Sequence, residues 1–406
     1  MSPLPSREAI PESTLLLFLV LCDPFREEIP GDISQQSWDH ISALSKLHGL
    51  TPFLYYRARS LGIKLPEQIE KEWLGIYLYQ IAGEKKARAQ IKELKEILDP
   101  EGIPFILLKG ASAMLRLYPQ PGLRTFCDLD ILIPFDRVFE FKRAMAASRY
   151  KPLSARNSPE DEELQKFDSH LDPICKDASL MIESHLNILG VKGDRSVANP
   201  DAWQEKEEAS TDGFNVNHLN VEHFVIHTLL HYSKHLSNEG FSEIKWLIDL
   251  LYAIKTWKID WTRVWTAARR WGVERDILPV MATLNYYCQT QILLPVTSES
   301  IALDVLVLGK QDRGEQFYAK LPAGYIDRFL QVRKLPHTAS KVRYILHLLF
   351  PTPANLRWRY HLSSKWSVVP YYFLHLFYTS KKFLIGLRHQ LLDHPDKLIA
   401  SKGSNE

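Results

Sequence analysis

Two stretches decide the fold of this chain: Leu108-Lys109-Gly110-Ala111-Ser112 and, after a turn-rich gap, Cys127-Asp128-Leu129-Asp130-Ile131-Leu132-Ile133. The second stretch has the composition of a strand. Because side chains alternate along a strand, Asp128 and Asp130 share one face. Paired carboxylates suit Mg²⁺, which takes further ligands from phosphates, and the Gly-Ala-Ser turn allows close approach of a triphosphate. Together the two stretches predict transfer of a nucleotidyl group.

The segments around these stretches predict a small α/β core. An apolar run at 103–108 has the length of a buried strand, and helical periodicity follows at 111–117 and 135–148. Residues 99–102 and 118–122 contain the Asp, Pro and Gly residues that form turns.

A third carboxylate is predicted on a neighbouring strand, because transfer with two Mg²⁺ ions requires about three of them around the triphosphate. Glu183 is the candidate, since a charge inside the apolar run 180–186 is costly without a partner. This run and residues 167–175 predict a hairpin that places His170 opposite His185. His185 also shares a face with Glu183.

Both flanks of the core predict helices, so the expected fold class is α+β and mostly helical. Helical spacing of apolar residues runs from residue 13 to 98 and resumes at 221, with breaks predicted at Pro279, Pro295, Pro322 and Pro351. A polar, acidic stretch at 157–163 predicts a loop. The expected parts are an N-terminal helical region at 1–98, the core at 99–215, a helical substrate and nucleotide-cleft region at 216–300, and a C-terminal helical region at 301–406.

Composition indicates an ordinary soluble globular protein, with 45% hydrophobic and 24% charged residues among 406. The net charge of +2 is too small to indicate nucleic acid as an obligatory partner. The four cysteines are far apart and form no Cys-x-x-Cys pair, which argues against a zinc site or a disulfide framework and favours a cytoplasmic location. No apolar run reaches the roughly 20 residues that a membrane-spanning helix needs.

These motifs resemble those of the polymerase-β-type nucleotidyltransferase superfamily, and within it the uncharacterised bacterial nucleotidyltransferase family proteins. The matching residues are Leu108-Lys109-Gly110, Tyr118-Pro119 with Leu123-Arg124, Asp128-Leu129-Asp130, Glu183-Ser184-His185, His231-Tyr232-Ser233-Lys234-His235 and Lys245-Trp246-Leu247-Ile248-Asp249. The resemblance implies a polymerase-β-like core that moves a nucleoside monophosphate from an NTP such as ATP to a hydroxyl, with release of pyrophosphate. It allows a small molecule, a sugar, a peptide or a protein as the acceptor.

The predicted catalytic residues and metal ligands are the three carboxylates Asp128, Asp130 and Glu183. They are expected to hold two Mg²⁺ ions, with Glu183 or Asp130 assisting deprotonation of the acceptor. The ordinary alternatives are a solvated strand end for the two aspartates and a cross-strand ion pair for Glu183.

The predicted nucleotide-binding residues are Lys109, Gly110, Ser112 and Arg124. A helix N-terminus attracts phosphate, and a guanidinium binds it with two parallel hydrogen bonds. Each role has an ordinary alternative: Ser112 as a helix cap, Lys109 pointing to solvent, and Arg124 supporting the turn before it.

A further set of residues is predicted to touch substrate or to orient the site: His170, His185, His231, His235 and Asp249. His227, His231 and His235 recur every four residues and form a stripe on one helix. Such a stripe suggests zinc, but no nearby Cys or His-Glu-x-x-His pattern supports it, and packing is the favoured explanation. If one histidine faces the nucleotide, it is His231 or His235, and Asp249 is a candidate partner for the stripe.

The C-terminal region at 333–402 is basic and aromatic, with twelve Lys and Arg residues against Asp393 and Asp396. This composition fits an anionic membrane surface or a polyanionic substrate, and the ordinary alternative is a helical domain with a basic solvated face. Contact with lipid would place the protein at the inner face of the membrane. A non-catalytic nucleotide-binding or membrane-surface scaffold that retains the fold is the alternative to an enzyme.

Overall fold

The computed structural model describes residues 10–27, 29, 32–153, 169–177, 179–189, 200–238, 240–292, 294–308, 338–351, 353, 356 and 368–393. The chain divides into two compact units: residues 1–155, 170–190 and 198–311 form the first, and residues 156–169, 191–197 and 312–406 form the second. The loop predicted at 157–163 and the helix break predicted at Pro322 lie outside the described residues.

The first unit is built around a seven-stranded mixed sheet with the strand order β3-β4-β5-β2-β1-β7-β6. Its strands are β1 (Ile106–Leu107), β2 (Asp128–Leu132), β3 (Lys151–Pro152), β4 (Ile174–Cys175), β5 (Met181–His185), β6 (Glu207–Thr211) and β7 (Phe214–His218). Strand β2 runs parallel to β5 and antiparallel to β1, which in turn runs parallel to β7. The predicted hairpin is confirmed, since β4 pairs antiparallel with β5 and His170 forms a bridge with His185.

Helices make up most of the first unit, which confirms the α+β, mostly helical fold class. They are α1 (Glu12–Cys22), α2 (Gln35–Leu47), α3 (Thr51–Ser60), α4 (Glu67–Leu98), α5 (Lys109–Arg116), α6 (Val138–Ala147), α8 (Pro200–Gln204), α9 (Val221–Asn238), α10 (Lys245–Thr256), α11 (Trp261–Arg270), α12 (Glu274–Cys288) and α13 (Leu303–Leu308). A single 3-10 turn, Phe135–Arg137, leads from β2 into α6.

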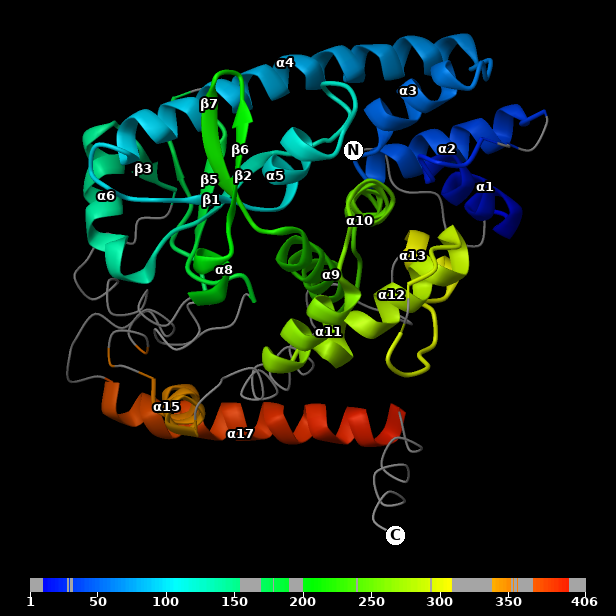
Figure 1. Cartoon of the computed structure of the whole chain (residues 1–406). Coiled ribbons are helices and arrows are strands. Elements are labelled where there is room, and N and C mark those ends of the chain that lie inside the picture. Colours follow the sequence, from blue (N-terminus) through cyan, green and yellow to red (C-terminus); the bar gives the residue numbers. More distant parts are fainter. Residues whose placement is uncertain are drawn as a thin grey trace. The chain divides into compact units, whose positions relative to one another are not determined.

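Helices α4 and α6 cover one face of the sheet, where α4 crosses its upper end (Figure 1). Leu129 and Ile131 of β2 lie in one buried cluster with Leu94 of α4. Since side chains alternate along a strand, Asp128 and Asp130 of β2 face away from this cluster. The packing of the core therefore sets the direction of the predicted catalytic carboxylates.

Helix α4 joins this core to the N-terminal helices as one rod of 32 residues, about 48 Å long at 1.5 Å per residue. Glu67 and Glu70 in its first turn and Lys95 in its last turn complement the helix dipole. The helix ends at Leu98, directly before the Asp99-Pro100 turn, as the sequence predicts. Its N-terminal part packs on α2 and α3, and its C-terminal part packs on the sheet and α6.

Gly122 fixes the segment between α5 and β2 against α4. Its φ of 80° is in the left-handed region, and a Cβ at this position would lie 2.6 Å from Ile81 Cγ1. Its backbone N–H donates to Glu84 Oε2 at 2.7 Å. The turn predicted at 118–122 therefore needs glycine at this position.

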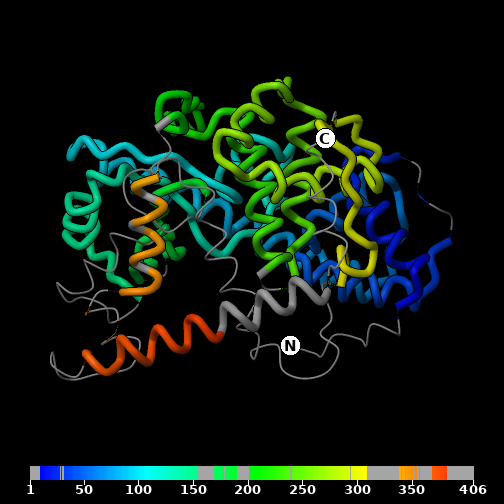
Figure 2. Tube along the Cα trace, turned by 90° about the horizontal axis from the view of Figure 1, so that it is seen from below, coloured from blue at the N-terminus to red at the C-terminus, as the bar shows by residue number. Residues whose placement is uncertain are grey.

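Helices α9 and α10 lie between the sheet and the N-terminal helices, as the tube shows in green between cyan and blue (Figure 2). Tyr252 of α10 makes edge contacts with Phe53 of α3 and Phe25. His48, after α2, bonds to the backbone of both Ile244 and Val307. These contacts bind segments far apart in the sequence into one unit.

Three details of this unit differ from the sequence predictions. Strand β1 spans two residues rather than 103–108, because its pairing with β2 and β7 is confined to Ile106 and Leu107. Pro279 lies inside α12 and does not break it, since a proline early in a helix removes a single backbone hydrogen bond. The β6–β7 hairpin was not predicted, and β7 runs across the boundary expected between residues 215 and 216.

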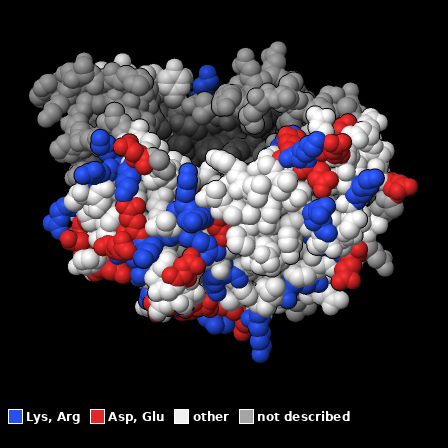
Figure 3. Space-filling model, turned by 90° about the horizontal axis from the view of Figure 1, so that it is seen from above, with Lys and Arg blue, Asp and Glu red and all other residues white. Residues whose placement is uncertain are grey.

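Acidic and basic side chains intermingle on the face that α4 presents (Figure 3). Several of them form ion pairs one turn apart, such as Lys71 with Glu67 and Lys95 with Asp99. The described part of this face therefore carries no continuous tract of one charge.

The described part of the second unit contains two longer helices, α15 (Thr338–Leu349) and α17 (Val368–Asp393). Tyr372 of α17 donates from its hydroxyl to the Pro351 carbonyl at 2.8 Å, and His375 bonds to the Leu348 carbonyl at 3.0 Å. Neither these helices nor any other described helix combines the length and apolar composition needed to cross a membrane.

Candidate active site

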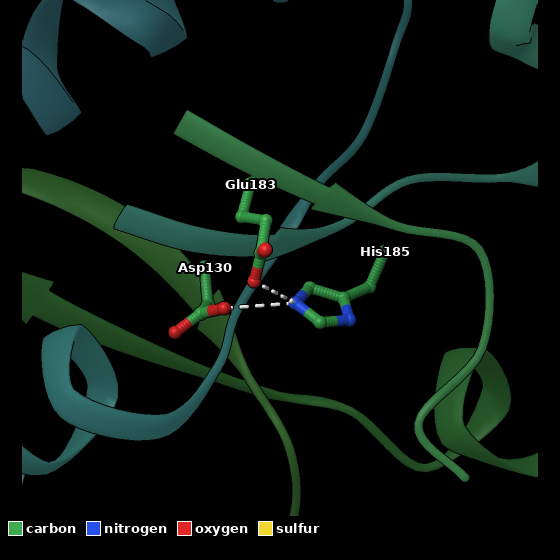
Figure 4. Close-up of side chains that lie close together, drawn as sticks. All are labelled: Asp130, Glu183 and His185. Carbon is green, nitrogen blue, oxygen red and sulfur yellow. Dashed lines mark hydrogen bonds and ion pairs between the residues drawn. The ribbon is translucent and has the colours of Figure 1, made fainter. Parts of the chain in front are cut away.

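The parallel pairing of β2 with β5 brings the predicted carboxylates together. Asp130 lies opposite Glu183 in the register, and Leu132 lies opposite His185. The three polar side chains Asp130, Glu183 and His185 point toward one another from the two strands (Figure 4). Glu183 therefore lies on the strand next to Asp-x-Asp, as expected, and its role as a metal ligand stays a prediction.

Asp130, Glu183 and His185 form the group of potential metal ligands found among the described residues. One ligand atom from each lies within 4.8 Å of the others. His185 Nε2 donates to Asp130 Oδ1 at 2.8 Å and lies 3.4 Å from Glu183 Oε2. Carboxylate oxygens and an imidazole nitrogen are groups that bind divalent cations.

Lys109 joins this group from the start of α5. Its Nζ lies 2.7 Å from Asp130 Oδ1 and 3.7 Å from Glu183 Oε2, and its side chain is 12% exposed. Its backbone has a φ of 43°, a left-handed conformation that non-glycine residues seldom adopt. Although burial acts to lower the pKa of Lys109, the carboxylates of Asp130 and Glu183 raise it above its usual value.

The three carboxylates have different protonation behaviour. Burial acts to raise the pKa of Asp130, but the Lys109 ammonium and the hydrogen bond from His185 hold it well below its usual range. A separate interaction of His185 with Glu183 lowers the pKa of Glu183, against the effect of burial. Burial and the nearby charge of Asp130 raise the pKa of Asp128 to about 6. Asp128 is therefore the carboxylate that accepts a proton most readily.

Asp128 stands apart from the three-residue group, at the end of β2 that is half-buried. Besides Lys109, the basic residue that lowers its pKa is Lys245 at the start of α10. The Lys245 ammonium is 2.7 Å from Glu243 and its side chain is 14% exposed. Lys245 had no predicted role, and no spacing in the sequence places it beside a strand more than a hundred residues earlier.

The predicted phosphate-binding turn is more buried than its sequence suggests. Ser112 is 1% exposed, and its hydroxyl shares a 2.9 Å hydrogen bond with His218 Nδ1. Gly110 is also buried, and a Cβ there would lie 3.6 Å from the Arg124 guanidinium. Ser112 thus ties α5 to β7, while Gly110 packs α5 against the segment before β2.

Arg124, predicted to bind phosphate, forms a buried ion pair with Asp249 of α10. Its Nε and Nη2 donate to both carboxylate oxygens at 2.8 to 3.0 Å, and the two side chains are 2% and 1% exposed. Tyr118 donates from its hydroxyl to the same carboxylate at 2.6 Å. Asp249, expected to touch substrate or one of the histidines, instead connects α10 to the turn before β2.

The predicted histidines occupy two places. His170 lies on the strand edge next to His185, with ring centroids 6.0 Å apart. His231 and His235 of α9 pack on Trp246, with ring centroids 4.2 and 5.0 Å away. Burial and the charge of Lys109 hold the pKa of His231 well below its usual value, which places this stretch of α9 within electrostatic reach of the site.

The sequence profile of a family described as "Uncharacterised nucleotidyltransferase" matches residues 34–288. This segment is more than half of the chain. The chain belongs to this nucleotidyltransferase family. Within the nucleotidyltransferase segment lie all described strands, helices α2 to α12 and the whole cluster around Asp130. No curated protein sequence matches the chain.

Proposed function

We propose that this nucleotidyltransferase moves a nucleoside monophosphate from an NTP to a hydroxyl group of an acceptor and releases pyrophosphate, with Mg²⁺ as its metal. The observation that supports the proposal is the pairing of Asp130 with Glu183 across β2 and β5, where Lys109 and His185 meet the same carboxylates. The family match supports the reaction class.

The residues present fit a divalent cation. Asp130 and Glu183 lie around a positive charge, the Lys109 ammonium, which stands where a metal ion would be bound. Asp128 adds a third carboxylate on the same face of β2. We assign Asp128, Asp130 and Glu183 as the metal ligands. Bound there, two Mg²⁺ ions would activate the attacking oxygen and stabilise the departing pyrophosphate.

The side chains then have separate tasks. His185 donates to Asp130 and holds its carboxylate in one orientation. Lys109 leaves Asp130 and donates to a phosphate oxygen of the NTP, at the N-terminal end of α5 where anions bind favourably. The acceptor hydroxyl gives its proton to a carboxylate of the site as its oxygen bonds to the α-phosphorus. Asp128, whose pKa is raised, accepts this proton more readily than Glu183 or Asp130, the two residues expected from the sequence. The bond from the α-phosphorus to the bridging oxygen breaks, and pyrophosphate leaves.

Acceptor choice belongs to the helices around this core, because function is carried by sites added to a common fold. The acceptor class remains a hydroxyl of a small molecule, a sugar, a peptide or a protein. The partly exposed rings of His231, His235 and Trp246 on α9 and α10 are our candidates for contact with the nucleotide or the acceptor.

Calorimetry with each NTP and Mg²⁺, together with a pyrophosphate-release assay, tests this proposal. We expect metal-dependent binding of at least one NTP, and its loss in the double variant Asp128→Asn/Asp130→Asn. The matched control is Asp136→Asn, which changes an exposed aspartate in the turn after β2. NTP binding that needs no metal, or that persists in the double variant, would refute the assignment. Binding without pyrophosphate release from any acceptor class would favour a non-catalytic nucleotide-binding protein.

A further inference from the structure

Helix α17 of the second unit exposes five large apolar side chains among its described residues. Val369, Phe373 and Phe377 recur every four residues and are 56%, 74% and 63% exposed. Leu374 and Tyr378 widen the same surface, at 38% and 46% exposure. We call these five residues the apolar stripe of α17.

The buried face of α17 carries two polar side chains in addition to the apolar Val368, which is 6% exposed. His375 and Thr379 are 3% and 2% exposed. Together with Tyr372, His375 bonds to carbonyls at the end of α15 and after it. A helix in a water-soluble protein normally buries its apolar stripe and exposes its polar face. The exposed apolar stripe of α17 therefore indicates that its outer face is adapted to something less polar than water.

Helix α15 repeats the pattern on a smaller scale. Val342, Leu346 and Phe350 also recur every four residues and are 51% to 52% exposed, while Tyr344 between them is 5% exposed. Both described helices of this unit therefore present a row of apolar side chains to the outside.

The charge of the segment that contains these two rows of apolar side chains indicates which kind of partner covers them. Residues 333–402 carry twelve Lys and Arg against two Asp, whereas the whole chain has a net charge of only +2. A second copy of the chain would bring two strongly basic segments together, and their repulsion opposes such a contact. An anionic lipid surface complements the charge, because it attracts Lys and Arg side chains near it, and it accepts aromatic and aliphatic side chains in its interface.

We propose that α15 and α17 lie on an anionic lipid surface, with the apolar stripe of α17 inserted between headgroups. No described helix has the features of a membrane span, so the contact is peripheral. The inference is independent of the catalytic assignment, because it uses residues of the second unit alone. It predicts that nucleotidyl transfer occurs next to a membrane.

Co-flotation of the full chain with vesicles tests the proposal. We expect binding to phosphatidylcholine vesicles that contain about 30% phosphatidylglycerol, weak binding to pure phosphatidylcholine, and loss of binding as salt is raised. The variant Phe373→Ser/Phe377→Ser should bind the anionic vesicles at least about tenfold more weakly, because each substitution removes an aromatic ring that would be buried in the interface. An unchanged circular dichroism spectrum and thermal transition of this variant serve as the check that the rest of the chain is intact.

The matched control is Leu78→Ser/Tyr79→Ser, which removes two apolar side chains that are 56% and 79% exposed on α4 of the first unit. This variant should bind vesicles as the wild type does. Equal binding of the Phe373→Ser/Phe377→Ser variant and the wild type would overturn the proposal. So would absence of vesicle binding combined with a concentration-dependent dimer that the same two substitutions abolish, because the stripe would then be covered by a second copy.

Discussion

The ammonium group of Lys109 neutralises part of the negative charge of Asp130 and Glu183. Its left-handed backbone, which costs of order 1 kcal/mol for a residue with a Cβ, brings the ammonium between Asp130 and Glu183. A divalent cation that arrives alone must displace a buried ion pair. When a cation binds together with an NTP, the phosphates replace the carboxylates as partners of the Lys109 ammonium. The geometry therefore favours binding of metal and nucleotide together.

Replacement of Lys109 by Met should strengthen metal binding in the absence of nucleotide. The carboxylates would lose their internal counter-ion and attract Mn²⁺ at least about tenfold more tightly, a gain near 1.4 kcal/mol. Electron paramagnetic resonance of free and bound Mn²⁺ measures this affinity. Lys176→Met, which removes a lysine paired with Glu93 away from the site, is the control. Unchanged Mn²⁺ affinity in Lys109→Met would show that the lysine does not compete with metal.

We expect Arg124 to stabilise the fold rather than to bind phosphate. Its guanidinium has both carboxylate oxygens of Asp249 as partners in a buried setting, and removal of one partner leaves an uncompensated charge. We expect Arg124→Gln to lower the free energy of unfolding by about 3 kcal/mol, measured by urea denaturation. The affinity of the folded variant for NTP should change less than threefold. A larger loss of affinity with normal stability would restore the predicted phosphate-binding role.

At the scale of elements, His48 joins the end of α2 to the helices that follow the sheet. Its Nδ1 accepts from the Ile244 N–H at 3.1 Å, and its Nε2 donates to the Val307 carbonyl at 2.8 Å. These two bonds require the neutral imidazole, and burial lowers the pKa of His48 to about 3. The junction between these helices is therefore sensitive to acid.

The contribution of His48 to the free energy of unfolding decreases as the pH falls. The folded pKa lies below the unfolded value near 6.5, so the unfolded chain takes up a proton first as pH falls. The stability from His48 is complete above pH 6.5 and decreases by about 1.4 kcal/mol per pH unit below it. His48→Gln lacks this dependence, and its stability deficit should shrink by that amount per unit between pH 6 and pH 4. A deficit that is constant with pH in urea titrations would contradict the neutral buried state.

The elements also show what the sequence could predict. The period-two pattern of β2 gave the face of Asp128 and Asp130, and the cost of an unpaired charge identified Glu183 on the neighbouring strand. The β6–β7 hairpin was missed, although Asp212-Gly213 with φ of 48° and 81° is the favoured two-residue turn. Strand β6 is partly exposed and lacks alternating apolar residues. The contact of Lys109 with Asp130 joins residues 21 positions apart and has no local signal.

On the scale of the whole molecule, the core depends on β7 (Phe214–His218), which extends beyond residue 215, the end of the core expected from the sequence. Strand β7 pairs with β1 on one side and β6 on the other, and Val216 lies in the cluster with α4. The cluster members Ala87, Ile91, Leu94 and Leu98 come from α4, which precedes residue 99. The core therefore needs segments from both sides of the range 99–215.

A fragment of residues 99–215 should fail to fold, whereas a fragment of residues 10–308 should fold. Circular dichroism would show no cooperative thermal transition in the first fragment and a single transition in the second. The shorter fragment loses the buried side chains of α4 as well as part of β7, and each large buried apolar residue contributes about 1.5–3 kcal/mol. A cooperative transition in the 99–215 fragment would show that the sheet is stable without them.

The length of α4 has a consequence for how this protein tolerates change. A straight helix turns by about 100° per residue, so one residue inserted near its middle would rotate its two halves relative to each other. The half that contacts α2 and α3 and the half that contacts the sheet could then not both keep their partners. Seven inserted residues would nearly restore the angle but separate the halves by about 10 Å. Helix α4 thus sets both the phase and the distance between the nucleotide core and the N-terminal helices, and its length admits almost no insertion or deletion.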